Sequence, residues 1–114
     1  MKTATLKPDR VFRALSDPIR LRILNLLVTG ELCVCDLVSV LGVPQPTASR
    51  HLAYLRKVGL VTVRKESVWC YYRLAPATTD FDAALRKCVE CCGELPRLAK
   101  DVKRLRGSRT GCCD

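Results

Sequence analysis

Cysteine is the residue whose number and spacing in this sequence point most directly to chemistry. The chain has eight cysteines in 114 residues, and Cys33 and Cys35 stand one residue apart in the segment ELCVCDLV. Thiolates are the protein ligands that suit soft, thiophilic ions such as trivalent arsenic and antimony. A single cysteine is often only a small buried side chain, but the paired spacing favours a binding site for such an ion.

A second group of cysteines lies toward the C-terminus and is a rival site. Its members are two adjacent pairs, one near a helix break and one in the segment 108–114: Cys91, Cys92, Cys112 and Cys113. We expect segment 108–114 to be a flexible tail. Cys70 and Cys88 are interpreted as packing residues, Cys88 either in the core or between two copies of the chain.

The compartment decides what clustered thiols do. The first ten residues, MKTATLKPDR, contain no apolar stretch of a secretory signal, and no apolar run approaches the ~18 residues that span a membrane. We therefore expect a cytoplasmic protein with no membrane partner. In a reducing cytoplasm, clustered thiols indicate metal, metalloid or redox chemistry instead of disulfides.

The charge of the chain indicates an acidic partner. The net charge is +9, and residues 37–79 contain six lysines and arginines against one acid. Such an excess on a small domain favours nucleic acid first and an anionic membrane surface second.

Two helices are expected ahead of the cysteine pair, over residues 8–15 and 18–30. Asp17 suits an N-cap, Pro18 suits a first turn and Gly30 suits a helix end. The first helix has three apolar residues on one side: Val11, Phe12 and Leu15. The second is apolar almost all round, which predicts a buried helix. Its polar residues form one narrow stripe: Arg22, Asn25 and Thr29.

The middle of the chain has the pattern of a helix-turn-helix followed by a wing. A helix at 34–41, a turn at GVPQP and a helix at 46–59 give the first motif. Three residues of the second helix face inward at i, i+4 and i+7: Ala48, Leu52 and Leu55. The β-rich runs LVTVRK and VWCYYRL predict a hairpin with Arg64 and Lys65 at its tip. The fold class is mainly α with a β-hairpin wing (α+β), a winged helix-turn-helix.

The last third is predicted to be helical, with a kink or restart at Pro96. An apolar stripe precedes the break: Phe81, Leu85, Cys88, Cys92 and Leu95. Another follows it: Leu98, Val102 and Leu105. Residues 1–107 then form one DNA-binding and dimerisation domain. Its amphipathic terminal helix is expected to pack against a second copy, which makes the protein a homodimer.

Polar side chains near the start of the second helix of a helix-turn-helix reach base edges in the major groove. Five residues are candidates for this reading: Gln45, Thr47, Ser49, Arg50 and His51. Lys57, Arg64 and Lys65 are candidates for phosphate contacts. For His51, the only histidine, a hydrogen-bonding or phosphate contact is favoured over base reading. The expected partner is double-stranded operator DNA.

The spacing of Cys33 and Cys35 also predicts a switch. Successive residues of a helix are about 100° apart, so residues i and i+2 point in nearly opposite directions. One ion can bind both thiols only if the first turn of their helix is distorted. Ion binding and the shape of the helix-turn-helix are therefore expected to be coupled.

The segments ELCVCDLV, QPTASRHLAYLRKVGLV and W-x-x-YRL together resemble the ArsR/SmtB family of bacterial metal-sensing repressors, over roughly residues 8–75. The resemblance implies a homodimeric winged helix that represses a metalloid-resistance operon. As(III) or Sb(III), bound by the cysteines, would be the inducer that releases the DNA, and no catalytic cofactor is implied.

One position departs from the family pattern and leaves alternatives open. Val38 stands where the best-known motif has a third cysteine, so a hydroxide, an external thiol or a distant cysteine must complete a three-ligand site. The zinc-sensing branch is disfavoured because it uses C-terminal histidines. Cadmium, lead and thiol oxidation remain alternatives, as does sensing through the C-terminal cysteines.

Two other classes of protein are alternatives to a repressor. A thiol enzyme such as an arsenate reductase is disfavoured because the sequence shows no βαβ pattern and no anion-cradling loop. A purely architectural DNA-binding protein leaves the cysteine pair unexplained. We therefore expect no enzymatic activity.

Overall fold

A computed structural model describes residues 6–107 of the chain. The described helices are α1 (Pro8–Leu15), α2 (Pro18–Leu27), α3 (Val34–Leu41), α4 (Gln45–Val58), α5 (Asp80–Cys92) and α6 (Pro96–Gly107). The described strands are β1 (Leu32–Cys33), β2 (Val61–Glu66) and β3 (Trp69–Leu74). The predicted helix-turn-helix and wing are both confirmed. The expected tail, with Cys112 and Cys113, lies outside the described residues.

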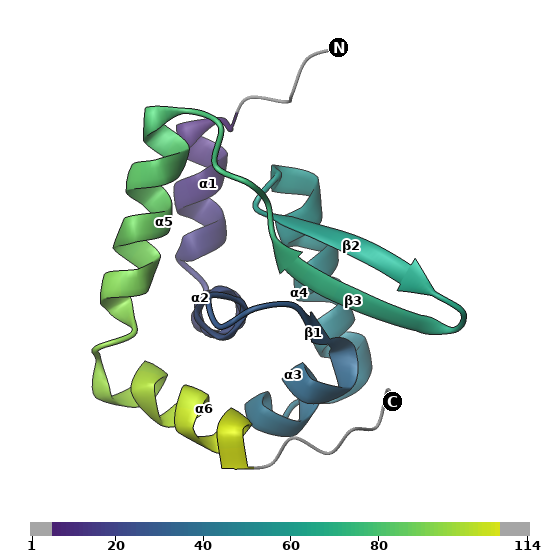
Figure 1. The fold of residues 1–114 in the computed structure, drawn as a ribbon. Coiled ribbons are helices and arrows are strands. Elements are labelled where there is room, and N and C mark those ends of the chain that lie inside the picture. The colour runs from purple at the N-terminus through teal and green to yellow at the C-terminus, as the bar shows by residue number, and fades with distance from the viewer. Residues whose placement is uncertain (1–5, 108–114) are drawn as a thin grey trace.

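Helix α2 is the centre of the fold, and the other five helices surround it (Figure 1). Asp17 caps it as predicted, because its Oδ1 accepts hydrogen bonds from the N–H groups of Ile19 and Arg20 at 2.8 and 3.1 Å. The helix ends at Leu27 and not at Gly30, because residues 28–30 form a turn in which the N–H of Gly30 donates to the Leu27 carbonyl. Four apolar residues of α2 are buried: Ile23, Leu24, Leu26 and Leu27.

The apolar face of α1 is rotated from the predicted one. Val11 and Ala14 are buried, whereas the side chain of Phe12 is 58% exposed and Leu15 is half-buried. The Phe12 ring meets Phe81 of α5 edge-on, with centroids 6.3 Å apart. Phe12 therefore belongs to the outer surface of the α1–α5 side.

The sheet has three strands, in the order β1-β3-β2, and the third strand was not predicted. Strand β1 pairs Leu32 with Tyr72 and Cys33 with Tyr71. The hairpin turns at Ser67, which has a left-handed φ of 59°, so the prediction that Arg64 lies at its tip is wrong. Arg64 lies opposite Tyr71, farther from the turn.

Helices α5 and α6 fold back over α2, and α6 also reaches α3. The restart at Pro96 is confirmed. Val89 is buried on α5 where Cys88 was expected, and Cys88 and Leu95 are exposed. The interpretation of Cys88 as a core residue is therefore wrong, because the inward face of α5 follows residues 81, 85 and 89.

The polar stripe of α2 faces α6 inside the chain. Arg22 donates to both carboxylate oxygens of Asp101, at 2.7 and 3.0 Å, and both residues are buried. Asn25 donates from Nδ2 to the Leu98 carbonyl at 3.0 Å. Helix α6 is therefore bound within its own chain, which the sequence did not predict. No helix within residues 6–107 is long and apolar enough to cross a membrane.

Candidate functional site

Helix α4, which carries the predicted reading residues, lies beside the hairpin of β2 and β3 (Figure 1). It begins directly after Pro44 and ends at Gly59, whose φ of 96° closes the helix in the left-handed conformation. Burial of Ala48, Leu52 and Leu55 fixes its rotation. The predicted DNA contacts on this helix are exposed or half-buried: Gln45, Thr47, Ser49, Arg50, His51 and Lys57.

Arg20 of α2 organises this surface and was missed by the sequence analysis. Its Cζ lies 4.0 Å from the ring centroid of Tyr54, and its Nη1 lies 3.4 Å from Nδ1 of His51. Because a guanidinium only donates hydrogen bonds, Nδ1 of His51 is the acceptor. The ring proton of neutral His51 then sits on Nε2, which is available to donate to a nucleic-acid acceptor.

The wing adds basic residues beside α4. Lys65 is exposed and lies opposite Cys70. Arg64, the other predicted phosphate contact, donates from its nitrogens to the carboxylates of Glu31 and Glu66. The structure therefore leaves Lys65 as the cation of β2 without a carboxylate partner among the ion pairs within residues 6–107.

The two thiols of the predicted sensor occupy different elements. Cys33 ends β1, is the N-cap of α3 with an extended backbone (φ −85°, ψ 164°), and is 3% exposed. Its Sγ donates a long hydrogen bond of 3.5 Å to Oδ2 of Asp36. Cys35 lies in the first turn of α3 and is half-buried. The predicted helix range 34–41 is confirmed and leaves Cys33 just before the helix, at the end of β1. The assumption that both cysteines lie within one helical turn is therefore wrong for Cys33.

The pair therefore spans the end of β1 and the first turn of α3. No group of three or more metal-ligating side chains is assembled in the part of the chain that the structure describes.

The rival thiols lie at the C-terminal end of α5. Cys88 and Cys91 are exposed and Cys92 is half-buried. Burial, together with the nearby thiols of Cys88 and Cys91, raises the pKa of Cys92 above its ordinary value. A raised pKa lowers the thiolate fraction at neutral pH, so Cys92 is a weaker nucleophile than an exposed cysteine.

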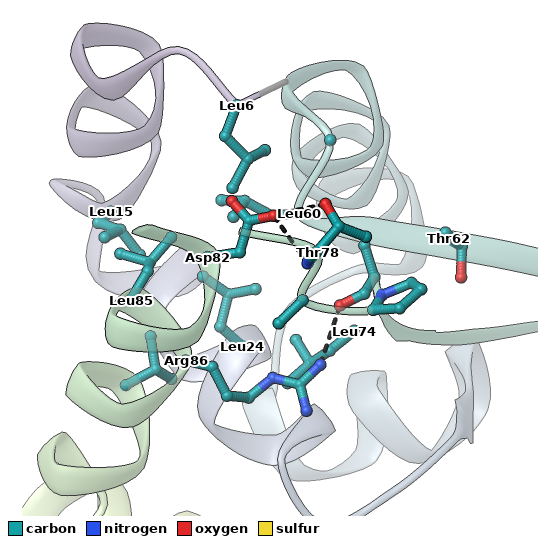
Figure 2. A pocket seen from close by; sticks show the side chains of 15 residues that line it. Leu6, Leu15, Leu24, Leu60, Thr62, Leu74, Thr78, Asp82, Leu85 and Arg86 are labelled. Atoms are coloured by element: carbon teal, nitrogen blue, oxygen red, sulfur yellow. Dashed lines mark hydrogen bonds between the residues drawn. The ribbon is translucent and has the colours of Figure 1, made fainter. Parts of the chain in front are cut away.

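A cavity of about 230 Å³ lies between α1, α5 and the base of the wing (Figure 2). Its wall is mostly aliphatic and includes Leu15, Leu24 and Leu85. Its charged residues are held by the loop after β3: Asp82 accepts from the N–H of Thr78 at 3.1 Å, and Arg86 donates to the Ala75 carbonyl at 2.9 Å. No described cysteine lines this cavity, so it is separate from both thiol sites.

The fold and the surface of α4 define a winged helix-turn-helix DNA-binding protein. Residues 17–63 match the family described as bacterial regulatory protein, arsR family. The chain is 42% identical over 102 residues to the arsenic resistance transcriptional regulator ArsR1 of Pseudomonas putida, covering 88% of this chain and 78% of that protein. The chain therefore belongs to the ArsR family of regulators, and it is a regulator and not an enzyme.

Other comparisons agree with this assignment. The arsenical resistance operon repressor of Escherichia coli is 51% identical over 72 residues, 62% of each chain. HlyU from Vibrio cholerae superposes with a TM-score of 0.68 at 32% identity, covering 79% of this chain and 91% of that one. A homodimeric winged helix-turn-helix domain from Mycobacterium bovis gives a TM-score of 0.63 at 31% identity, with 85% and 95% coverage.

Proposed function

We propose that this protein is a cytoplasmic, metalloid-responsive repressor that binds operator DNA as a homodimer and is released when As(III) or Sb(III) binds Cys33 and Cys35. The observation that carries the proposal is the position of the pair. One thiol ends a strand of the wing sheet and the other lies in the first turn of α3. The names of the relatives support arsenic as the inducer.

The thiols bind by exchange with hydroxide. Each thiol proton leaves with one hydroxide of As(OH)₃ as water while an As–S bond forms, and no oxidation state changes. Two exchanges at Cys33 and Cys35 leave one hydroxide on arsenic, so Val38 need not supply a ligand. The Sγ of Cys33 must give up its hydrogen bond to Asp36 in this step.

The DNA contacts follow from the exposure of α4 and the wing. Arg50 is suited to two hydrogen bonds with guanine and Gln45 to adenine, with Thr47, Ser49 and His51 beside them. Lys57 and Lys65 are suited to phosphates. Exposed Phe12 on the α1–α5 side supports a dimer through terminal helices, as does the homodimeric solved relative.

The test replaces the proposed ligands by serine. Cys33→Ser and Cys35→Ser should keep DNA affinity and lose release by arsenite, because a hydroxyl is close to a thiol in size but a poor ligand for a soft ion. Cys70→Ser, at the half-buried cysteine of β3, is the matched control and should respond normally. Fluorescence anisotropy of a labelled operator duplex measures both properties.

Sensing through the C-terminal thiols is the second candidate, because Cys88 and Cys91 are exposed near Cys92. Cys91→Ser with Cys92→Ser tests it, and serine at Cys112 and Cys113 tests the tail. Loss of the arsenite response in these variants, with a normal response in Cys33→Ser, would transfer the sensor to α5. Titration of the protein–DNA complex with cadmium, lead or peroxide, in parallel with arsenite, shows which of them releases the DNA.

A further inference from the structure

Arg64 is bound on three sides within the chain. Its Nε and Nη2 donate to the two carboxylate oxygens of Glu31, at 3.2 and 2.8 Å, and its Nη1 donates to Glu66 at 2.6 Å. Its Cζ lies 4.6 Å from the ring centroid of Tyr71. A guanidinium held by two carboxylates is a poor partner for a phosphate. Because two of its nitrogens bind one carboxylate, the guanidinium also fixes the orientation of the Glu31 side chain. The ammonium group of a lysine would not fix this orientation.

The register of the sheet places Arg64 in line with a sensor thiol. Cys33 pairs with Tyr71 and Tyr71 pairs with Arg64. Side chains of directly paired residues stand on the same face of a sheet, with Cβ atoms about 4.5–5.5 Å apart. Cys33, Tyr71 and Arg64 therefore form one row across all three strands, which we call the sheet-face row.

Glu31 lies just before β1 and binds Arg64, the residue of the row on β2. It precedes Cys33 by two residues, which is the period that returns a side chain to the same face of an extended chain. Its carboxylate reaches across to Arg64, so it joins the segment before β1 to strand β2.

Only two residue pairs, Leu32 with Tyr72 and Cys33 with Tyr71, tie β1 to the wing by backbone pairing. Strand β1 has only two residues, so its backbone offers few hydrogen bonds to β3. The side-chain fork between Glu31 and Arg64 is therefore a substantial part of what connects the thiol segment to the wing. A surface ion pair is usually weak, but a bidentate pair within a network of charges is the exception.

We propose that Glu31 and Arg64 are positioning residues that transmit occupation of Cys33 and Cys35 to the wing, an inference that rests on the proposed function. A ligand that requires both thiols turns the end of β1 toward α3. Glu31 moves with that strand and leaves Arg64 to Glu66, so the wing loses its attachment to the thiol segment. Arg64 itself touches neither the ligand nor the DNA in this scheme.

The test compares the two carboxylates that bind Arg64, Glu31 through two hydrogen bonds and Glu66 through one. Glu31→Gln breaks the two-oxygen fork and Glu66→Gln weakens a single hydrogen bond, and each replaces a carboxylate by a neutral amide that raises the net charge by one. Their general electrostatic effects on DNA binding should therefore match. Only Glu31→Gln cuts the link to the thiol segment, because Glu66 lies on β2 beside Arg64. Circular dichroism checks that both variants remain folded.

Three quantities are measured on the full-length protein: arsenite binding by thiolate–arsenic absorbance, emission of Trp69, and DNA affinity with and without arsenite. Trp69 is the only tryptophan and opens β3. The duplex is one selected from random DNA by the wild type. Arsenite binding should persist in both variants. In Glu31→Gln the arsenite effect on DNA affinity should fall by at least about 5-fold, the lower end of measured couplings, and the Trp69 response should be lost.

Glu66→Gln should keep the wild-type response, and Arg64→Lys, which keeps the charge but not the fork, should match Glu31→Gln. Equal arsenite responses in Glu31→Gln and Glu66→Gln would overturn the proposed link while leaving the repressor function intact. A wild type that neither binds arsenite at Cys33 and Cys35 nor releases DNA would refute both.

Discussion

At the scale of single residues, the proposed base contact and the proposed phosphate contact lie on different elements, α4 and β2. Arg50 is exposed on α4 and Lys65 is exposed on the wing. We expect Arg50→Ala to cost about 1–3 kcal/mol on the preferred duplex and to relax the choice of base at one position. Lys65→Ala should weaken binding to all sequences alike and lower the salt dependence by about one unit of slope. Titrations on specific and random duplexes at several salt concentrations measure both effects.

The same titrations can also contradict the assignment of α4 as the reading helix. If Arg50→Ala weakens specific and random DNA by the same factor, α4 is not the reading helix. Arg20→Met offers a companion variant, because it removes the cation over Tyr54 and the hydrogen bond to His51 without replacing any side chain of α4. Its effect should therefore fall on the sequence-specific part of binding.

At the scale of elements, α6 depends on one buried ion pair. Arg22 and Asp101 are 8% and 3% exposed and share two hydrogen bonds. Asp101→Ala should lower the free energy of unfolding by about 3–5 kcal/mol, because it leaves a buried guanidinium without a partner. Replacing both residues, by Arg22→Met with Asp101→Leu, should restore most of the lost free energy of unfolding. Urea unfolding measures the free energy of unfolding of both variants. Equal decreases in the two would contradict the explanation by an unpaired buried guanidinium.

The start of α2 gives an element-scale dependence on pH. Burial opposes ionisation of Asp17, but the N–H groups of Arg20 and Ile19 outweigh it and hold the carboxyl pKa below its ordinary 3.8. A lowered pKa stabilises the fold above the unfolded value and is lost as pH falls through the folded value. Asp17→Ala should cost about 1 kcal/mol at pH 7. This difference should shrink in acid, as followed by thermal unfolding from pH 7 to pH 3.

At the scale of the whole molecule, the α1–α5 side is the surface that we assign to the dimer. Phe12→Asp should yield a monomer, because it places a charge where an exposed ring is expected to be covered. Val68→Asp, at an 82% exposed valine in the wing turn, is the matched control and should stay dimeric. Sedimentation velocity distinguishes the two states.

The proposed dimer also predicts the geometry of the DNA site. Two-fold related reading helices require half-sites one helical turn, about 34–36 Å, or a multiple of it apart. The Phe12→Asp monomer should therefore bind the full site much more weakly than the wild type does. Full affinity of that monomer for a single half-site would refute the paired arrangement.

The sequence by itself determined the helices, the turn and the wing, because these depend on local periodicity and local chain stops. Gly42 and Gly59 have φ angles of 70° and 96°, which favour glycine and end α3 and α4 where expected. Asp17 and Pro96 likewise mark helix starts through their own backbone chemistry. The candidate reading residues of α4 followed from the same periodicity, since its buried face fixes its outer face.

Only the tertiary structure decided which distant residues meet. Arg22 with Asp101, Arg20 with His51, and Glu31 with Arg64 are separated by 79, 31 and 33 residues. No local pattern encodes such partners. The two-residue β1 is set by pairing with β3 and not by its own propensity, and so short a run of residues carries no period. That pairing places Cys33 in the sheet and Cys35 in the helix, because a strand needs a neighbour whereas a helix supplies its own hydrogen bonds.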